Sequence, residues 1–305
     1  MKFSVWPNMA NPVDEALDTA RWADAAGWYG VWYADHYMPN TGTEEIKRGD
    51  THECWAMLPA IAVVTERVRI GSLVAPTSIH HPAVLANRAT TLDLLSNGRM
   101  VLGLGAGWQI NEHKAYGIEL EPPGRRVQRF EEAIQIIRLL TTQELTNFAG
   151  DVYSVTGAPA DPKPIQSPLP ILVGTAGDRM LRIAARHADE WNSWGNLETA
   201  IAKRAAFERA CDDVGRDPRS LHTSVQALVL ITESEEKIER ARTGPFGDRT
   251  LAGSVGQIVD AMGRYAELGF AEFIVPDFNL GSSRDQRREG LERIDAEIVR
   301  ALATA

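Results

Sequence analysis

The sequence predicts an α/β fold, a single (β/α)₈ TIM barrel over residues 1–305 with insertions at its C-terminal mouth. Short runs rich in β-branched and aromatic residues alternate with longer helical segments, and eight such pairs follow one another. Most of these runs are unbroken and apolar, which is typical of parallel strands that are buried on both faces. The longest connecting segments all follow a strand, so we expect them to crowd the C-terminal mouth, where barrel active sites lie.

The first half of the chain supplies four of the expected pairs. In order they are strand 3–6, helix 12–26, strand 29–34, helix 53–65, strand 68–74, helix 82–95, strand 99–104 and helix 125–140. Gly27 directly after the first helical pattern suits a helix C-terminus, and Pro82 suits the first turn of the third helix. Two long segments, 37–52 and 108–124, follow strands and are predicted to be mouth loops.

The second half repeats the alternation after a break. A small hairpin is expected over 145–155, and five prolines within 157–170 indicate an extended connector. Then follow strand 170–174, helix 178–187, strand 189–192, helix 198–214, strand 223–231, helix 254–268, strand 270–275 and helix 284–302. A third long segment, 232–253, again follows a strand and includes a charged stretch that reads as a solvated helix.

The rival architecture is a doubly wound sheet that binds a dinucleotide. That fold needs G-x-G-x-x-G at the start of a helix, because the glycines allow the turn and the close approach of the pyrophosphate. The best candidate here is Gly103-Leu104-Gly105-Ala106-Gly107-Trp108, in which Trp108 takes the place of the last glycine. A long loop is predicted after it, so the barrel is the better reading.

Composition excludes several classes of function. The 305 residues are 44% hydrophobic and 24% charged, as in a soluble globular protein, and the net charge of −9 disfavours nucleic acid as a partner. Cys54 and Cys211 are the two cysteines, far apart, so neither a disulfide framework nor a cysteine metal site is readable. The N-terminus turns polar too soon for a signal peptide, and no apolar run approaches a membrane span. We expect a cytoplasmic protein without membrane partners.

Candidate functional residues lie where the predicted strands end. Four tryptophans occur there, and their wide rings either line a site for a planar ligand or fill space between loops: Trp6, Trp108, Trp191 and Trp194. His36 at a mouth can transfer protons near neutral pH, or it is structural. Asp35 and His36 are neighbours on an extended chain, so their side chains point opposite ways and seldom bind one metal ion together. The seven histidines also lack the spacing of metal ligands, so we expect no metal.

Two glycine-containing segments could approach a ligand. The segment 103–107 allows close backbone contact because its glycines carry no Cβ. The segment 174–178 joins a strand to a helix, and its first-turn amides could hold a phosphate. The alternative is an ordinary turn in which Asp178 caps the helix.

Taken together, these residues resemble the bacterial luciferase-like flavin and deazaflavin oxidoreductases. The resemblance is greatest to the actinobacterial branch that uses coenzyme F-420, an 8-hydroxy-5-deazaflavin. The matching segments are 30–36, 65–71, 81–86, 94–99, 103–108, 112–118, 130–138 and 182–192, with a weaker match over 251–275.

The resemblance implies where the cofactor would bind. The ring would lie in the mouth, with Asp35 in contact with it and His36 on the substrate side. A non-proline cis peptide is expected behind the ring at Ser72–Leu73. The implied cofactor-binding residues are Asp35, Ser72, Leu73, Val74, Ala106, Gly107, Trp108, Asn111, Ala176, Gly177, Asp178 and Arg179.

One departure from the family pattern bears on the substrate. Sugar-phosphate dehydrogenases of this family carry a glutamate general acid directly after the glycine that matches Gly107, whereas this chain has Trp108, whose indole cannot transfer that proton. His36 is therefore the expected catalytic residue, with Glu112 in reserve. The expected substrate pocket is aromatic and is formed by Trp6, Trp55, Trp191 and Asn192.

The resulting hypothesis is hydride transfer between coenzyme F-420 and a small apolar or aromatic substrate that contains C=C, C=N, C=O or an alcohol. One alternative is a luciferase-like monooxygenase that uses reduced FMN and dioxygen. Another is a non-catalytic flavin-binding protein that kept the fold. The expected partners are the small-molecule substrate and a second copy of the chain in a homodimer.

Overall fold

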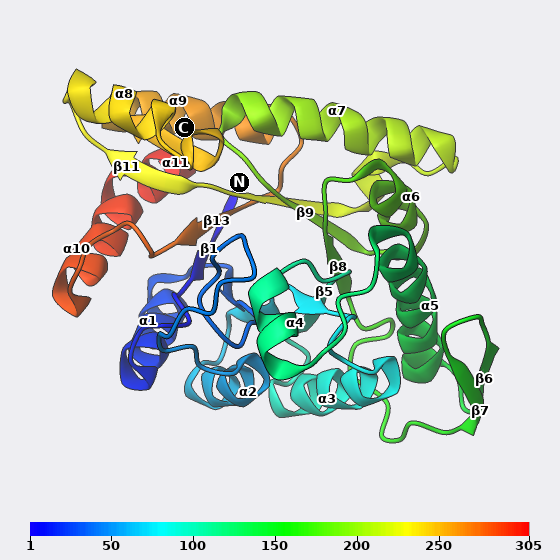
Figure 1. The fold of residues 1–305 in the computed structure, drawn as a ribbon. Coiled ribbons are helices and arrows are strands. Elements are labelled where there is room, and N and C mark those ends of the chain that lie inside the picture. Colours follow the sequence, from blue (N-terminus) through cyan, green and yellow to red (C-terminus); the bar gives the residue numbers. More distant parts are fainter. Residues whose placement is uncertain (305) are drawn as a thin grey trace.

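The computed structural model describes residues 1–304 and contains the predicted barrel (Figure 1). Its eight parallel strands are β1 (Lys2–Trp6), β2 (Gly30–Tyr33), β3 (Arg69–Ser72), β5 (Met100–Gly105), β8 (Ile171–Gly174), β9 (Glu190–Trp194), β10 (His222–Gln226) and β13 (Glu272–Pro276). They pair in this order around the ring, and β13 pairs with β1 to close it. The predicted fold class is confirmed.

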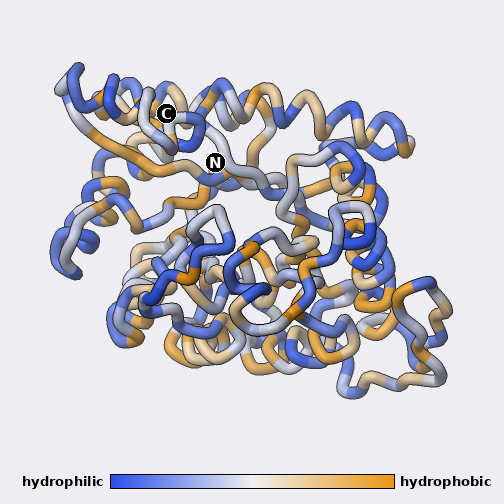
Figure 2. The backbone as a smooth tube through the Cα atoms, in the orientation of Figure 1, coloured by the Kyte–Doolittle hydropathy of each residue, from blue (hydrophilic) through white to orange (hydrophobic). Residues whose placement is uncertain are grey.

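Helices cover the outside of the barrel (Figure 1). They are α1 (Val13–Ala26), α2 (Cys54–Val64), α3 (Pro82–Leu95), α5 (Pro123–Thr142), α6 (Asp178–His187), α7 (Leu197–Asp213), α9 (Val255–Glu267) and α10 (Arg284–Ile294), followed by the π-helical η3 (Asp295–Val299) and α11 (Arg300–Thr304). Hydrophobic and hydrophilic residues alternate along them, as Figure 2 shows for α6 and α7, because one side of each helix packs on the strands. No helix among residues 1–304 is long and apolar enough to cross a membrane.

The core has two parts. The larger part lies between the strands and the helices. The smaller part fills the barrel itself and consists of Trp6, Trp32, Ala34, Leu73, Val101, Leu172 and Ile274. Because successive strand residues point to opposite faces, β1, β2, β5, β8 and β13 contribute apolar side chains to both parts, whereas β9 and β10 turn polar side chains such as Asn192, Ser224 and Gln226 into the barrel.

Two predicted strands are interrupted. The strand expected over 68–74 ends at Ser72, and after a bulge the chain forms β4 (Ala75–Pro76) beside β5. The strand expected over 223–231 divides into β10 and β11 (Leu228–Ile231). β11 leaves the ring and pairs with β12 (Thr250–Gly253) in a separate two-stranded sheet.

Two of the three mouth segments are partly ordered into helices, and the segment 37–52 contains none among the described residues. The predicted loop 108–124 contains α4 (Ile110–Tyr116), which ends at Gly117 in a left-handed conformation. The segment 232–253 holds α8 (Glu235–Thr243) and the short η2 (Gly247–Arg249). The predicted hairpin is present as β6 (Thr146–Ala149) and β7 (Ser154–Ala158), and η1 (Pro218–Ser220) precedes β10.

Hydrogen bonds join α4 to the segment 37–52 beside it. Gln109 Nε2 donates to the Met38 carbonyl and Asn111 Nδ2 to the Pro39 carbonyl, both at 2.9 Å. These two insertions therefore form one connected part of the mouth.

Candidate active site

A cavity of about 380 Å³ opens at the C-terminal ends of the strands. The strand ends and the βα segments that follow them form its walls, which is the usual place of a barrel active site. Ten of the predicted site residues line it: Trp6, His36, Leu73, Val74, Ala106, Gly107, Trp108, Glu112, Ala176 and Asn192.

An imidazole and a carboxylate form a pair in the cavity wall. His36 follows β2, and its Nδ1 lies 3.0 Å from Oε1 of Glu112 on α4. Glu112 is only 1% exposed, and its Oε2 accepts the backbone N–H of Tyr37 at 2.9 Å. Both carboxylate oxygens thus bind one segment, 36–37, so Glu112 holds the imidazole in place and leaves its Nε2 free for exchange with a substrate.

Trp108 lies at the outer edge of the same wall. Its ring meets the His36 ring edge to face, with centroids 5.5 Å apart, and the residue is 56% exposed. An exposed indole at a cavity rim is a candidate contact for an apolar ligand.

Asp35 is fully buried behind the cavity wall. Its Oδ2 accepts Trp55 Nε1 at 3.0 Å and lies 2.8 Å from Nε2 of the buried His80. Its Oδ1 has no hydrogen-bond partner among the described residues. Trp55, predicted for the substrate pocket, does not line this cavity, and its indole is turned to Asp35.

The bulge after β3 forms an apolar wall of the cavity. A non-proline cis peptide is present here, but it joins Leu73 to Val74, one residue later than predicted. Leu73 and Val74 both line the cavity. Ser72 does not, because its hydroxyl is buried and donates to the Gly103 carbonyl at 2.8 Å.

The neighbouring glycines make room for this bulge. A Cβ on Gly103 would lie 1.9 Å from the Ser72 carbonyl oxygen, and one on Gly105 would lie 2.8 Å from Val74 Cγ2. Real Cβ atoms do not approach so closely. Gly103 and Gly105 are thus needed for packing against the bulge, a reason that differs from the ligand approach expected from sequence.

The strand β8 leads into α6 beside the cavity. Ala176 lines the cavity, and α6 begins after Gly177 without a hydrogen bond from a capping side chain. Uncapped first-turn amides favour an anion. Asp178 and Arg179 are exposed and lie outside the cavity lining, and Arg179 contacts the Gly124 carbonyl at 3.4 Å.

Two further predicted residues lie outside the cavity. Trp191, predicted for the substrate pocket, is fully buried against α7, where its ring stacks on Phe207 with centroids 4.3 Å apart. The reason is the alternation along β9, which turns Asn192 and Trp194 inward and Trp191 outward. Asn111 is also buried and serves the contact between α4 and Pro39 described above.

Sequence reasoning missed part of the opposite wall. Trp194, Lys203 on α7 and Arg249 at the end of η2 all line the cavity. Trp194 is one of the four tryptophans that the sequence places at strand ends, so of these three only the two basic residues were missed. Nothing in the local sequence places Lys203 or Arg249, since each is brought in by a helix or an insertion.

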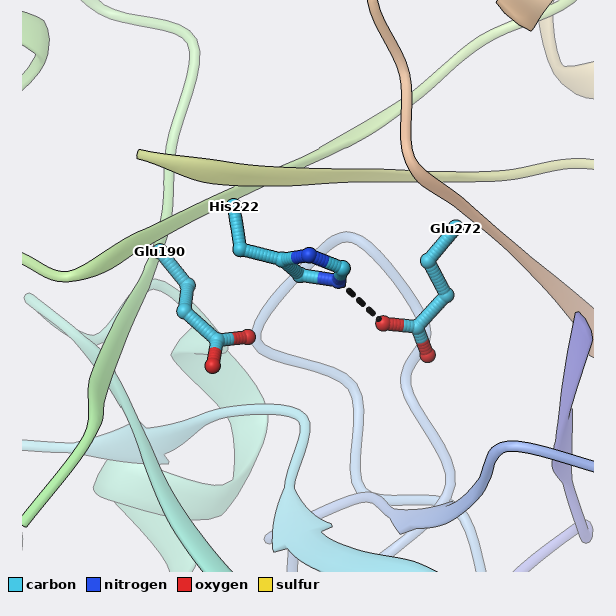
Figure 3. A group of neighbouring side chains, drawn as sticks. All are labelled: Glu190, His222 and Glu272. Carbon is cyan, nitrogen blue, oxygen red and sulfur yellow. Dashed lines mark hydrogen bonds and ion pairs between the residues drawn. The ribbon is translucent and has the colours of Figure 1, made fainter. Parts of the chain in front are cut away.

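Figure 3 shows a second polar cluster, at the other end of the barrel. Glu190, His222 and Glu272 are the first residues of β9, β10 and β13, and their ligand atoms lie within 4.8 Å of one another. His222 Nε2 contacts Glu272 at 2.9 Å, and Arg69 pairs with Glu190. Burial alone would raise the pKa of Glu272, but hydrogen bonds, led by that from His222, lower it below its ordinary value. The two carboxylates of this cluster thus already have partners, Arg69 for Glu190 and His222 for Glu272.

The fold and the mouth cavity together define a (β/α)₈ barrel with an open site at the C-terminal ends of its strands. The sequence profile of the luciferase-like monooxygenase family matches residues 1–254. The chain belongs to this family, which confirms the resemblance seen in the sequence motifs.

Relatives in this family include enzymes with known names. The chain is 36% identical over 170 residues to the F-420-dependent glucose-6-phosphate dehydrogenase of Amycolatopsis mediterranei. The matched region covers 55% of this chain and 49% of that protein. It is 36% identical over 253 residues to the phthiodiolone/phenolphthiodiolone dimycocerosates ketoreductase of Mycobacterium sp. (strain JLS). Here the matched region covers 76% of this chain and 66% of that protein. The chain therefore spans about half of the first relative's length and about two thirds of the second's.

A solved structure shares the whole fold. The F-420-dependent secondary alcohol dehydrogenase in complex with an F-420–acetone adduct has a TM-score of 0.81, covers 98% of both chains and is 19% identical in sequence. At 19% identity this likeness shows a shared fold and nothing more.

Proposed function

We propose that the protein transfers a hydride between coenzyme F-420 and a small apolar or aromatic organic substrate. The observation that carries this proposal is the His36–Glu112 pair in the wall of an open barrel mouth. The chain also shares 36% identity with relatives named for F-420-dependent dehydrogenation and for ketone reduction. Reduction of C=C, C=N or C=O, or oxidation of an alcohol, are the reactions that fit.

Several features of the mouth fit the cofactor. Trp6 Nε1 and Asp35 Oδ1 are buried polar atoms without partners among the described residues, and such atoms are costly unless a ligand or water binds them. Leu73 and Val74 offer an apolar surface for a ring system, and the uncapped start of α6 offers amides for a phosphate.

The proposed cofactor-binding residues act in two ways. Those that would touch the cofactor are Asp35, Leu73, Val74, Ala106, Gly107, Trp108, Ala176 and Gly177, together with the first-turn amides of Asp178 and Arg179. Ser72 and Asn111 would act indirectly, because Ser72 supports the bulge and Asn111 anchors α4.

His36 is the proposed proton donor and acceptor. When bound, coenzyme F-420 supplies a carbon centre that gives or takes a hydride. With Nδ1 engaged by Glu112, His36 would deliver or remove the substrate proton through Nε2. Glu112 fixes the ring orientation and stabilises the imidazolium. Trp6 and Asn192, which line the cavity, are the proposed substrate contacts.

The second candidate is a monooxygenase that uses reduced FMN and dioxygen, because the family carries that description. Turnover assays separate the two. Oxidation of reduced F-420 by a panel of enones, imines and ketones without oxygen uptake supports our proposal. Oxygen uptake that needs FMN and a flavin reductase would establish the monooxygenase. Binding of a cofactor without turnover of any substrate in either assay would favour a non-catalytic flavin-binding protein.

We further propose a cytoplasmic homodimer. The exposed side of α2 contains no charged residue, and Val63 there is 65% exposed. On α3, Val84 is 51% and Leu95 is 49% exposed. Apolar patches of this kind favour burial between protein copies. Analytical sedimentation should show a dimer. Val63→Asp should weaken this dimer, whereas Ile201→Asp, at an exposed position of α7, should not. A wild-type monomer at micromolar concentration would refute this.

A further inference from the structure

Two basic side chains line the mouth cavity on the side opposite His36. Lys203 belongs to α7, which follows β9, and Arg249 ends η2, which follows β11. In the strand order of the ring, β9 lies four places from β2, the strand that leads to His36. The cavity therefore has an imidazole–carboxylate wall on one side and a basic wall on the other.

Both cations are held close to Trp194. The Nζ atom of Lys203 donates to the Trp194 carbonyl at 2.6 Å, and the Arg249 guanidinium lies 5.7 Å from the centre of the Trp194 ring. The nearest acidic group of Arg249 is Asp248, whose carboxylate is 3.8 Å from Arg249 Nε. These contacts fix the position of the two side chains without using most of their N–H groups.

Lys203 has no carboxylate partner within ion-pair distance among the residues the structure describes. Burial, with the nearby positive charge of Arg249, lowers the pKa of its ammonium below the ordinary value. A partly buried cation beside a second cation is unfavourable by itself, and an anion that enters the cavity would relieve both costs. Two of the three ammonium N–H groups remain available for it.

Aromatic rings adjoin this basic wall. Trp6 meets Trp194 with ring centroids 5.3 Å apart, and Phe278 meets Trp6 edge to face at 4.9 Å. An apolar surface therefore continues from the two cations to the barrel interior.

We propose that Lys203 and Arg249 form a subsite for an anionic oxygen group of the substrate, a carboxylate or a phosphate, while the apolar part of the same molecule lies against Trp194 and Trp6. This rests on the proposed function and narrows it: the substrate is an amphipathic anion whose reacting carbon lies toward His36. The cofactor also carries anionic groups, but the uncapped start of α6 offers a separate place for its phosphate.

The test compares charged and neutral probes on the cofactor-free protein. Tryptophan fluorescence titrations would use 1-naphthoate and 1-naphthyl phosphate against the neutral 1-naphthalenemethanol. We expect at least one anion to bind about tenfold more tightly than the neutral probe, and less so as salt increases. Lys203→Met and Arg249→Gln should remove this preference, whereas Lys203→Arg should restore much of it. Equal binding of all three probes, or a preference that survives both removals, would overturn the proposal.

Controls separate this proposal from the cofactor assignment. Arg240→Gln removes an exposed arginine of α8 outside the cavity and should keep the wild-type preference. F-420 affinity should be unchanged in Lys203→Met and Arg249→Gln. A tenfold loss of F-420 affinity with an intact probe preference would assign these cations to the cofactor and overturn the substrate subsite. If the wild type prefers the anionic probes but does not bind F-420, the proposed function fails and the anion subsite stands.

Discussion

The Nδ1 atom of His36 lies 3.0 Å from Oε1 of Glu112, while Oε2 of the same carboxylate binds the Tyr37 amide at 2.9 Å. One buried side chain on α4 thereby fixes both the imidazole and the backbone next to it. The pairing joins two βα segments that lie 75 or more residues apart in the chain. It makes the mouth insertions part of the proposed proton-transfer machinery.

The first prediction concerns this pair. Glu112→Gln should reduce kcat by about tenfold to a hundredfold, because the amide no longer stabilises the imidazolium or selects its tautomer. KM and F-420 affinity should change little, and the pH profile of kcat should shift. Steady-state kinetics checks this, with Glu44→Gln as the control, since Glu44 pairs with Lys114 on the exposed surface. An unchanged kcat in Glu112→Gln would remove Glu112 from the mechanism.

The second prediction concerns the partners of Asp35. His80→Ala leaves the buried Asp35 carboxylate with only the Trp55 hydrogen bond, so unfolding free energy should fall by about 1–3 kcal/mol. F-420 affinity should fall as well, because Asp35 loses its fixed orientation. The neighbouring His81→Ala, on an exposed side chain, should cost much less. Urea unfolding and fluorescence titration measure both effects. Equal losses in the two variants would show that His80 does not support Asp35.

The third prediction concerns the glycines beside the bulge. A Cβ on Gly103 would lie 1.9 Å from the Ser72 carbonyl oxygen, so Gly103→Ala should destabilise the protein by about 2 kcal/mol or more. Gly263 on α9 has no atom within 4 Å of an added Cβ, and Gly263→Ala should stabilise the protein by about 0.5–1 kcal/mol. Thermal and urea unfolding measure whether each substitution raises or lowers the stability of the protein. A Gly103→Ala variant as stable as the wild type would refute the packing argument.

The fourth prediction concerns pH. Burial raises the pKa of Asp277 from 3.8 to about 7, against hydrogen bonds from Asn8 and Asn11 that lower it. The folded state therefore keeps a proton that the unfolded state releases between these two values. Stability from this group is present below pH 4 and is lost as pH rises toward 7, by on the order of 4 kcal/mol.

Asp277→Asn isolates that effect. The variant cannot titrate at this position, so its urea-unfolding free energy should decline less than that of the wild type between pH 4.5 and pH 7.5. Asp260→Asn, at an exposed position of α9, should leave the wild-type slope. The assignment fails if the two variants follow the same curve.

Much of the barrel could be predicted because its strands and helices have strong local signals. The helix 82–95 begins at a proline, and the helix 178–187 follows small residues and has a clear amphipathic pattern, and both are found with the predicted bounds. The split of the strand expected over 223–231 could not be seen, because no glycine or proline separates β10 from β11 and the pairing of β11 with β12 is a tertiary contact.

The site was predictable at the strand ends and obscure elsewhere. Trp6 is the last residue of β1 and His36 lies three residues beyond the end of β2, so barrel geometry places them in the mouth. The positions of Trp191 and Trp55 outside the cavity lining were harder to foresee, because one depends on the strand alternation of β9 and the other on a partner, Asp35, that lies on another segment. Lys203 on α7 and Arg249 in the 232–253 insertion can be placed at the cavity only from the folded structure.

Direct titration tests whether the mouth binds coenzyme F-420. The purified protein would be titrated with oxidised and reduced F-420 and, separately, with FMN, and binding followed by fluorescence. We predict micromolar or tighter F-420 binding, weakened at least about tenfold by Gly177→Pro, which removes the Gly177 N–H at the uncapped start of α6, and no comparable FMN binding. Micromolar binding of FMN with none of F-420 would contradict the account.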